Sequence, residues 1–145
     1  MPPALQLEMA NRLEEIPHAR EKVSRWLAGQ GAFAGADYLA GLAIEELVTN
    51  WIKYGHDDTR EHRLALRLEF EDGELRLCVT DDGRPFNPLD RPAPDVTLSA
   101  EERPIGGLGL HLLRRFFDRM EYRRVDGVNR LTLAKRGPLD DRLPA

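Results

Sequence analysis

Glu46 and Asn50 are the residues whose types and spacing best suit chemistry. They lie four positions apart in a mostly apolar segment that predicts a helix from about Tyr38 to Tyr54, so both side chains fall on one helix face. Burying a carboxylate or an amide without a partner is costly. The pair therefore indicates a ligand, a metal or a polar network at this face. Surface charges beside an amide in the core are the alternative on this segment alone.

The same helix face could handle a triphosphate. Mg²⁺ prefers hard oxygen ligands and keeps several waters, so the amide oxygen of Asn50 could complete a shell of phosphate oxygens. Glu46, one turn earlier, could orient or deprotonate a nucleophile. Lys53, one turn later, could meet phosphate charge. Glu45 is the internal comparison, because it lies about 100° round the helix and points elsewhere.

A second candidate is the run Asp81-Asp82-Gly83, where a strand ends in a carboxylate and a turn follows. The Asp81 carboxylate could accept the amino proton of adenine, a proton that guanine lacks at that position. Gly83 would let the backbone approach a flat base. A common turn is the alternative.

A third candidate is Gly106-Gly107-Leu108-Gly109, at the start of an expected helix. Free amide groups at a helix start favour anions, and glycine removes the side chain that would block a phosphate. Arg103, just before this run, could reach the same phosphates. A tight turn and a solvated arginine are the alternatives.

Hydrophobic patterning predicts the elements that must position these residues. We expect one domain with the element order β-α-α-β-β-loop-α-β-β, an α+β two-layer sandwich with helices on one face of a mostly antiparallel sheet. Asp72-Gly73 predicts a hairpin turn. The expected strands are 4–10, 62–71, 75–79, 120–125 and 130–135, the expected helices 14–29, 38–54 and 107–119, the expected turn 126–129, and the expected tail the last ten residues.

Composition limits the possible function classes. The chain has 145 residues, 41% of them hydrophobic, and a net charge of −4, which argues against a nucleic-acid partner. No apolar run reaches the roughly 18 residues of a membrane span, and no signal-peptide pattern opens the chain, so we expect a cytoplasmic protein. Cys78 is the single cysteine and is expected to be reduced and core-facing. His56 and His111 lack a partner at metal-ligand spacing, which favours structural roles.

Taken together, and in this order, the three segments resemble the N, G1 and G2 boxes of the histidine-kinase-like ATPase superfamily, the Bergerat fold of gyrase, Hsp90, MutL-type repair proteins and sensor kinases. The resemblance spans roughly residues 5 to 135, and within the superfamily it is to the stand-alone anti-sigma-factor serine kinases of bacterial partner-switching systems. The matching motifs are Glu46-x-x-x-Asn50, Asp81-x-Gly83 and Gly107-Leu108-Gly109-Leu110, together with the segments 117–122 and 127–133, which are similar to that branch's C-terminal hairpin.

The resemblance implies a role for each motif. By it, Asn50 binds Mg²⁺, Glu46 is the catalytic base, Asp81 holds adenine, Gly107 and Gly109 flank the phosphates, and residues 86–105 form an ATP lid. The implied activity is that of an Mg²⁺-ATP-dependent serine/threonine kinase acting on a STAS-domain anti-sigma-factor antagonist. A phosphate adds about −1.5 to −2 charges and would release that partner. The freed kinase, expected to be a homodimer, would then sequester a sigma factor or another target.

One departure from the family pattern keeps an alternative open. The G1 box usually continues with a second glycine, whereas this chain has Gly83-Arg84-Pro85, and proline fixes its backbone angle and lacks an amide proton. The stiffer turn leaves room for an ATP-binding anti-sigma or regulatory module with little or no kinase activity, although the retained Glu46 favours a kinase. A detached sensor-kinase catalytic domain would need an acceptor histidine in trans. A conformational ATPase of the gyrase or Hsp90 kind would need transducer domains for which 145 residues leave no room.

Overall fold

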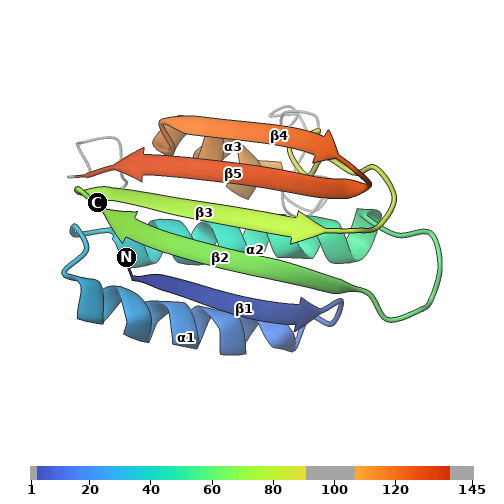
Figure 1. The fold of residues 1–145 in the computed structure, drawn as a ribbon, viewed down its shortest axis with the longest axis horizontal. Helices are drawn as coiled ribbons and strands as arrows, with labels where there is room; N and C mark the ends of the chain where they lie inside the picture. Colours follow the sequence, from blue (N-terminus) through green and yellow to red (C-terminus); the bar gives the residue numbers. More distant parts are fainter. Residues whose placement is uncertain (1–2, 91–106, 138–145) are drawn as a thin grey trace.

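The chain folds into the predicted order of helices and strands in a computed structural model that describes residues 3–90 and 107–137. The predicted α+β class, with helices covering one face of an antiparallel sheet, is confirmed (Figure 1). The elements are β1 (Ala4–Ala10), α1 (Glu15–Gln30), α2 (Ala36–Tyr54), β2 (Arg63–Glu71), β3 (Glu74–Asp81), α3 (Gly107–Phe116), β4 (Arg119–Val125) and β5 (Val128–Arg136).

The five strands form one antiparallel sheet in the order β1-β2-β3-β5-β4. Two tight turns set its hairpin registers. Asp72 and Gly73 have φ angles of 54° and 77°, and Asp126 and Gly127 have 52° and 77°. Positive φ at both central residues is typical of the type I′ hairpin turn, whose twist matches that of the flanking strands.

The core lies between the sheet and the three helices that cover it in Figure 1. Alternate residues of β2 and β3 point inward because side chains switch faces at every position of a strand. The inward set includes Leu64, Leu66, Leu68, Leu75, Leu77 and Val79. Ten of the nineteen residues of α2 are buried, including Asn50 and Trp51. The polar site residues of α2 therefore lie on a helix that is packed into the core.

Several predicted boundaries are wrong by a few residues. α3 ends at Phe116 rather than near position 119, because the Asp118 amide leaves the helix and donates to the Ala134 carbonyl (2.9 Å). The second hairpin turn has two central residues rather than four, since Val125 already pairs with Val128. β5 accordingly begins two residues before the predicted strand and continues to Arg136, within the predicted tail.

The prediction for Cys78 is also wrong. Leu77 and Val79 are buried against the helices, so the alternation of β3 turns Cys78 to the opposite, open face of the sheet, where its side chain is half-buried. The Thr132 hydroxyl lies 3.9 Å from its sulfur across the β3–β5 pair. Across residues 3–90 and 107–137, no helix is both long enough and apolar enough to span a bilayer.

Candidate functional site

Three side chains of α2, those of Glu46, Asn50 and Trp51, have a buried polar atom without a partner among the described residues. Asn50 is 2% exposed, and its Nδ2 has no hydrogen-bond partner among the described residues. One turn earlier, the Oε2 of Glu46 is also buried without a partner. A buried polar atom left unpaired costs about 1–3 kcal/mol, and proteins keep few of them. Two such atoms on one helix face therefore mark a place where a ligand's polar atoms fit.

The start of α3 lies directly against Glu46. A Cβ atom built at Gly109 would overlap the Cγ, Cδ and Oε1 atoms of Glu46, so a larger residue at this position would require the Glu46 side chain to move. The glycine of the third motif is thereby brought into contact with the carboxylate of the first. α3 begins at Gly107, and free amides at a helix start favour anions.

The surroundings of Glu46 change its acidity. Burial first, and then the neighbouring Glu45 carboxylate, raise the pKa of Glu46, while Lys53 acts in the opposite direction. Lys53 is exposed on the same helix, two turns from Glu46. A carboxylate with a raised pKa holds a proton more readily, which is the property expected of a general base.

The donor set at this face fits a hard cation. The amide of Asn50 and the carboxylate of Glu46 supply oxygen atoms of the kind that Mg²⁺ prefers. Within the part of the chain that the structure describes, no group of three or more His, Cys, Asp or Glu side chains is arranged to hold a metal ion. A cation at this site would therefore rely on Asn50 together with the oxygens of its ligand.

The second motif forms a closed polar turn at the end of β3. Asp81 is half-buried, and its Oδ2 accepts a hydrogen bond from the Gly83 amide (3.0 Å). The Nδ2 of Asn129 lies 3.3 and 3.4 Å from the two carboxylate oxygens of Asp81. The carboxylate is thus held by donors on two sides.

The residues after Gly83 anchor the turn to the rest of the fold. Arg84 donates from Nη2 to the Tyr54 carbonyl (2.7 Å) and from Nε to the Gly55 carbonyl (3.2 Å), at the end of α2. Phe86 packs against the core, and Pro88 is buried. The first residues of the predicted lid are therefore part of the packed fold, and positions 91–105 lie outside the described residues.

One small cavity lies beside Asp81 among the residues that the structure describes. A cavity of about 10 Å³ is lined by Trp51, Leu64, Val79, Asp81, Phe86, Pro88, Tyr122, Asn129 and Leu131. That volume is about one water molecule. A purine base does not fit there as the side chains stand, so base binding at Asp81 requires Phe86 and Pro88 to move or the base to lie on the outer side of the carboxylate.

A stack of aromatic rings supports the turn from the α2 side. The His56 ring stacks on His62 at 3.7 Å and meets Trp51 edge-on at 4.9 Å. Burial first, and then the charge of His62, lower the pKa of His56, whereas the nearby Asp81 raises it. His56 therefore lies beside the G1 turn, and its structural role stays a prediction.

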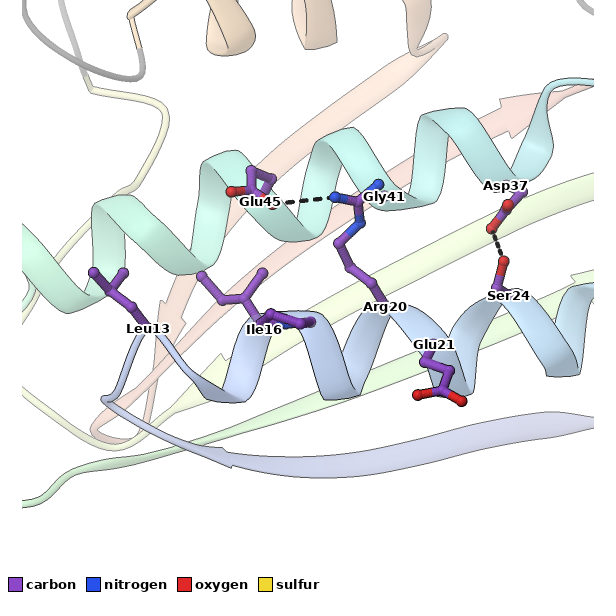
Figure 2. Close-up of a pocket in the computed structure, with 9 residues that line it drawn as sticks. Leu13, Ile16, Arg20, Glu21, Ser24, Asp37, Gly41 and Glu45 are labelled. Atoms are coloured by element: carbon purple, nitrogen blue, oxygen red, sulfur yellow. Dashed lines mark hydrogen bonds and ion pairs between the residues drawn. The ribbon is translucent and has the colours of Figure 1, made fainter.

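Glu45 behaves as the helix geometry predicts. It points away from the site, is exposed, and pairs with Arg20 of α1 (3.4 Å). Arg20 and Glu45 are among the residues that line a groove of about 560 Å³ between α1 and α2 (Figure 2). Further along the same groove, the Ser24 hydroxyl donates to the Asp37 carboxylate (2.7 Å). None of the predicted nucleotide-binding residues lines this groove, so it is a separate surface.

Some predicted site residues lie outside the part of the chain that the structure describes. Arg103 and Gly106 lie outside the described residues, and Leu108 is described only as part of the α3 backbone. Sequence reasoning missed Asn129 as a site residue because it placed this position in a turn. A signal was available: Asn129, Leu131 and Leu133 alternate, and a polar residue in the inward register of a strand calls for a partner.

The fold and the site together define a two-layer nucleotide-binding domain. The chain belongs to the histidine kinase-like ATPase domain family, whose model matches residues 9–135. The predicted family is thereby confirmed, and with it the use of ATP that the family name implies.

Relatives carry names that agree with the predicted kinase. The chain is 29% identical to the serine/threonine-protein kinase BtrW of Bordetella bronchiseptica over 92 residues, which are 63% of this chain and 65% of BtrW. It is 22% identical to an anti-sigma F factor of Clostridium botulinum, covering 79% of this chain and 80% of that protein. It is 28% identical to the serine-protein kinase RsbW of Listeria monocytogenes, covering 71% of each.

A solved structure has the same fold. The crystal structure of the RsbU and RsbW domains of Rv1364c from Mycobacterium tuberculosis matches with a TM-score of 0.60 and 20% identity. The match covers 92% of this chain and 32% of that longer chain. At this identity the likeness shows the architecture alone.

Proposed function

We propose that this chain is an Mg²⁺-dependent protein serine/threonine kinase that uses ATP to phosphorylate a STAS-domain anti-sigma-factor antagonist. The observation that supports it best is the unpartnered Glu46–Asn50 pair facing the glycine start of α3. A protein that only binds a nucleotide has no need of a carboxylate with a raised pKa at that point. The names of two relatives, both called kinases, support the same proposal.

The proposed reaction moves one phosphoryl group. The serine hydroxyl oxygen of the partner forms a bond to the γ-phosphorus, the bond from that phosphorus to the β–γ bridging oxygen breaks, and ADP leaves. The hydroxyl proton passes to the Glu46 carboxylate, whose raised pKa suits it to accept a proton. The amides at the start of α3 and the Lys53 ammonium face the phosphate charge.

Asn50 is the residue proposed to hold Mg²⁺. Its buried amide supplies an oxygen of the kind that fits this ion, and the phosphate oxygens of the nucleotide would supply the others. When bound, the ion would neutralise charge on the phosphate oxygens. Asp81 and Gly83 are the residues proposed to receive the adenine ring.

The proposed role in the cell is partner switching. Phosphorylation would place about −1.5 to −2 charges in the interface and release the antagonist. The kinase, proposed to act as a homodimer, would then bind a sigma factor or another regulatory target. Light scattering of the purified protein tests the dimer, since a molar mass equal to one chain would contradict it.

One observation favours a second candidate, an ATP-binding regulatory module with little or no kinase activity. Among the described residues, the cavity that Phe86 and Pro88 line beside Asp81 holds about 10 Å³, and Arg84 ties the same turn to the end of α2. A site that must open before the base enters would turn over slowly. The two candidates differ in phosphoryl transfer and not in binding.

The deciding experiment combines the full chain with Mg²⁺, γ-labelled ATP and a STAS-domain antagonist. We expect label on the antagonist with the native protein. Glu46→Ala should bind the nucleotide but transfer label roughly 10²–10⁴-fold more slowly, which is the usual contribution of a general base. Asn50→Ala should remain folded and lose Mg²⁺-ATP binding. Glu21→Ala, which alters an exposed carboxylate paired with Arg25 on α1, should resemble the native protein.

Each outcome separates the candidates. Tight binding of ATP and antagonist without label transfer would leave only the regulatory module. Native transfer rates in Glu46→Ala would remove its role as base. Absence of nucleotide binding by the native protein would refute both candidates.

A further inference from the structure

Asn129 is a buried amide at the centre of the polar turn. It is 4% exposed and lies on β5, directly opposite Asp81 of β3 on one side and Arg124 of β4 on the other. Residues directly opposite on neighbouring strands share a face of the sheet. The antiparallel register therefore lines up a carboxylate, an amide and a guanidinium across three adjacent strands.

The nitrogen and the oxygen of the Asn129 side-chain amide have opposite kinds of hydrogen-bond partner. Its Nδ2 donates to the Arg84 carbonyl (2.8 Å) and across both oxygens of Asp81 (3.3 and 3.4 Å). Its Oδ1 accepts from the Phe86 amide (3.3 Å), the Tyr122 hydroxyl (2.5 Å) and Arg124 Nη1 (2.9 Å). In these contacts, Nδ2 thus faces only acceptors and Oδ1 faces only donors. No other side chain of this size satisfies both sides, because aspartate lacks the donors and leucine lacks both.

These hydrogen bonds determine how the Asp81 carboxylate can bind a ligand. An ionised carboxylate has about four lone-pair positions. The Gly83 amide takes one of them, and the Asn129 amide lies across both oxygens. Since the hydrogen-bond partners of Asp81 among the described residues are all donors, Asp81 is kept as an acceptor with at least one position left for a donor on a ligand. Arg124 also donates to the Gly83 carbonyl (2.9 Å), so the same row holds the backbone of the turn.

We propose that Asn129 is a positioning residue that sets base specificity through Asp81. This inference rests on the proposed nucleotide-binding function. By donating to both oxygens, Asn129 keeps the Asp81 carboxylate oriented as an acceptor, and the base it selects is one with an exocyclic amino donor, adenine rather than guanine. Removing the donated hydrogen bond weakens ATP binding and lowers the preference for ATP over GTP.

The test compares two substitutions that change size little. Asn129→Asp sets a second carboxylate against Asp81, and Asn129→Leu removes the donor without adding charge. Arg130→Gln is the matched control, because it changes the net charge by the same −1 at the next position of β5, whose side chain is exposed on the other face. The dissociation constants of fluorescent ATP and GTP analogues are measured from pH 8 to pH 5.5, with circular dichroism to follow folding.

We expect the Asn129→Asp protein at pH 8 to bind the ATP analogue at least roughly tenfold more weakly, about 1.4 kcal/mol, with a smaller ATP-to-GTP ratio. Two carboxylates that share a site take up one proton well above their ordinary pKa values. At pH 5.5 the protonated group at position 129 donates to Asp81 again, so ATP binding should recover at least threefold. The Asn129→Leu protein has no proton to gain and should stay weak at both pH values.

The same series controls for the other ionisable and charged groups around Asp81. His56, Arg84, Arg124 and Tyr122 surround the turn in every variant, so the native protein and Arg130→Gln report their contribution. Native affinity and selectivity in Asn129→Asp at pH 8 would overturn the inference. Equal weakening of both variants with no recovery at pH 5.5 would also overturn it, because it would show a purely structural role. A native protein that binds neither analogue would instead refute the proposed function itself, and this inference with it.

Discussion

Gly109 is the residue at which two separate motifs meet. Its missing side chain lets α3 lie against the Glu46 carboxylate, where an added Cβ would overlap three atoms. Glycine is usually explained by backbone freedom at a helix start, but here the space taken by a neighbouring side chain is sufficient reason. The contact makes the position of Glu46 depend on how α3 packs against α2.

Gly109→Ala should therefore be destabilising. Forcing an extra methyl group into a packed site costs about 1–3 kcal/mol, so we expect that loss in the free energy of unfolding, measured by urea titration. Adding Glu46→Ala removes the atoms that Cβ would overlap and should restore most of the stability without restoring phosphoryl transfer.

The matched control for this substitution is Gly29→Ala. An added Cβ at Gly29 in α1 would meet nothing within 4 Å, and alanine favours a helix by roughly 0.5–1 kcal/mol over glycine. Its stability should stay equal or rise. Equal stability of the two alanine variants would contradict the predicted overlap of Gly109 with Glu46.

At the scale of elements, the C-terminal end of α2 is tied to the turn after β3. The last carbonyls of a helix have no partners within the helix. Arg84 supplies partners to Tyr54 and Gly55, and so joins the helix that carries Asn50 to the turn that carries Asp81. Arg84 occupies the variable middle position of the Gly-x-Gly pattern, next to Pro85, which is the residue that departs from it.

Replacing Arg84 by glutamine should loosen that connection. Because the Arg84 side chain is exposed, we expect a loss of about 1 kcal/mol in the free energy of unfolding. Amide hydrogen exchange should accelerate in the last turn of α2. Arg123→Gln, which alters an exposed ion pair with Glu121 on β4, should change stability by less than about 0.5 kcal/mol. Unchanged exchange at the end of α2 in Arg84→Gln would contradict the anchoring role.

The sequence predicted elements better than it predicted contacts. Helical periodicity and strand alternation are local, which explains why the element order, the α2 helix and the Asp72-Gly73 turn are confirmed. The end of α3 depends on a bond from Asp118 to Ala134, sixteen residues away, so no local pattern reveals it. The four-residue spacing of Glu46 and Asn50 within one helix is likewise local, so the sequence predicted this pair. The contacts of Asn129 instead depend on the pairing of three strands, which no local pattern reveals.

At the scale of the whole molecule, ligand binding at the proposed site would be coupled to folding. The site draws on α2, β3, α3 and β5, so a nucleotide bound there contacts elements from most of the chain. A ligand that binds only the folded state stabilises it in proportion to the logarithm of its concentration.

Mg²⁺ with a non-hydrolysable ATP analogue should therefore raise the stability of the entire chain. At a hundredfold excess over the dissociation constant, we expect roughly 2.7 kcal/mol, seen as a single cooperative shift of the melting transition. Asn50→Ala should show no shift, and Glu45→Ala should show the native shift. A shift of equal size in Asn50→Ala would contradict the assignment of this residue.

The position of Cys78 also has a practical consequence. It is the only thiol in the sequence, and it sits half-buried on the side of the sheet turned away from the helices. A maleimide dye should therefore attach at one defined spot without entering the interior. Such a probe would give single-site fluorescence or distance measurements on the native sequence, with no engineered cysteine required.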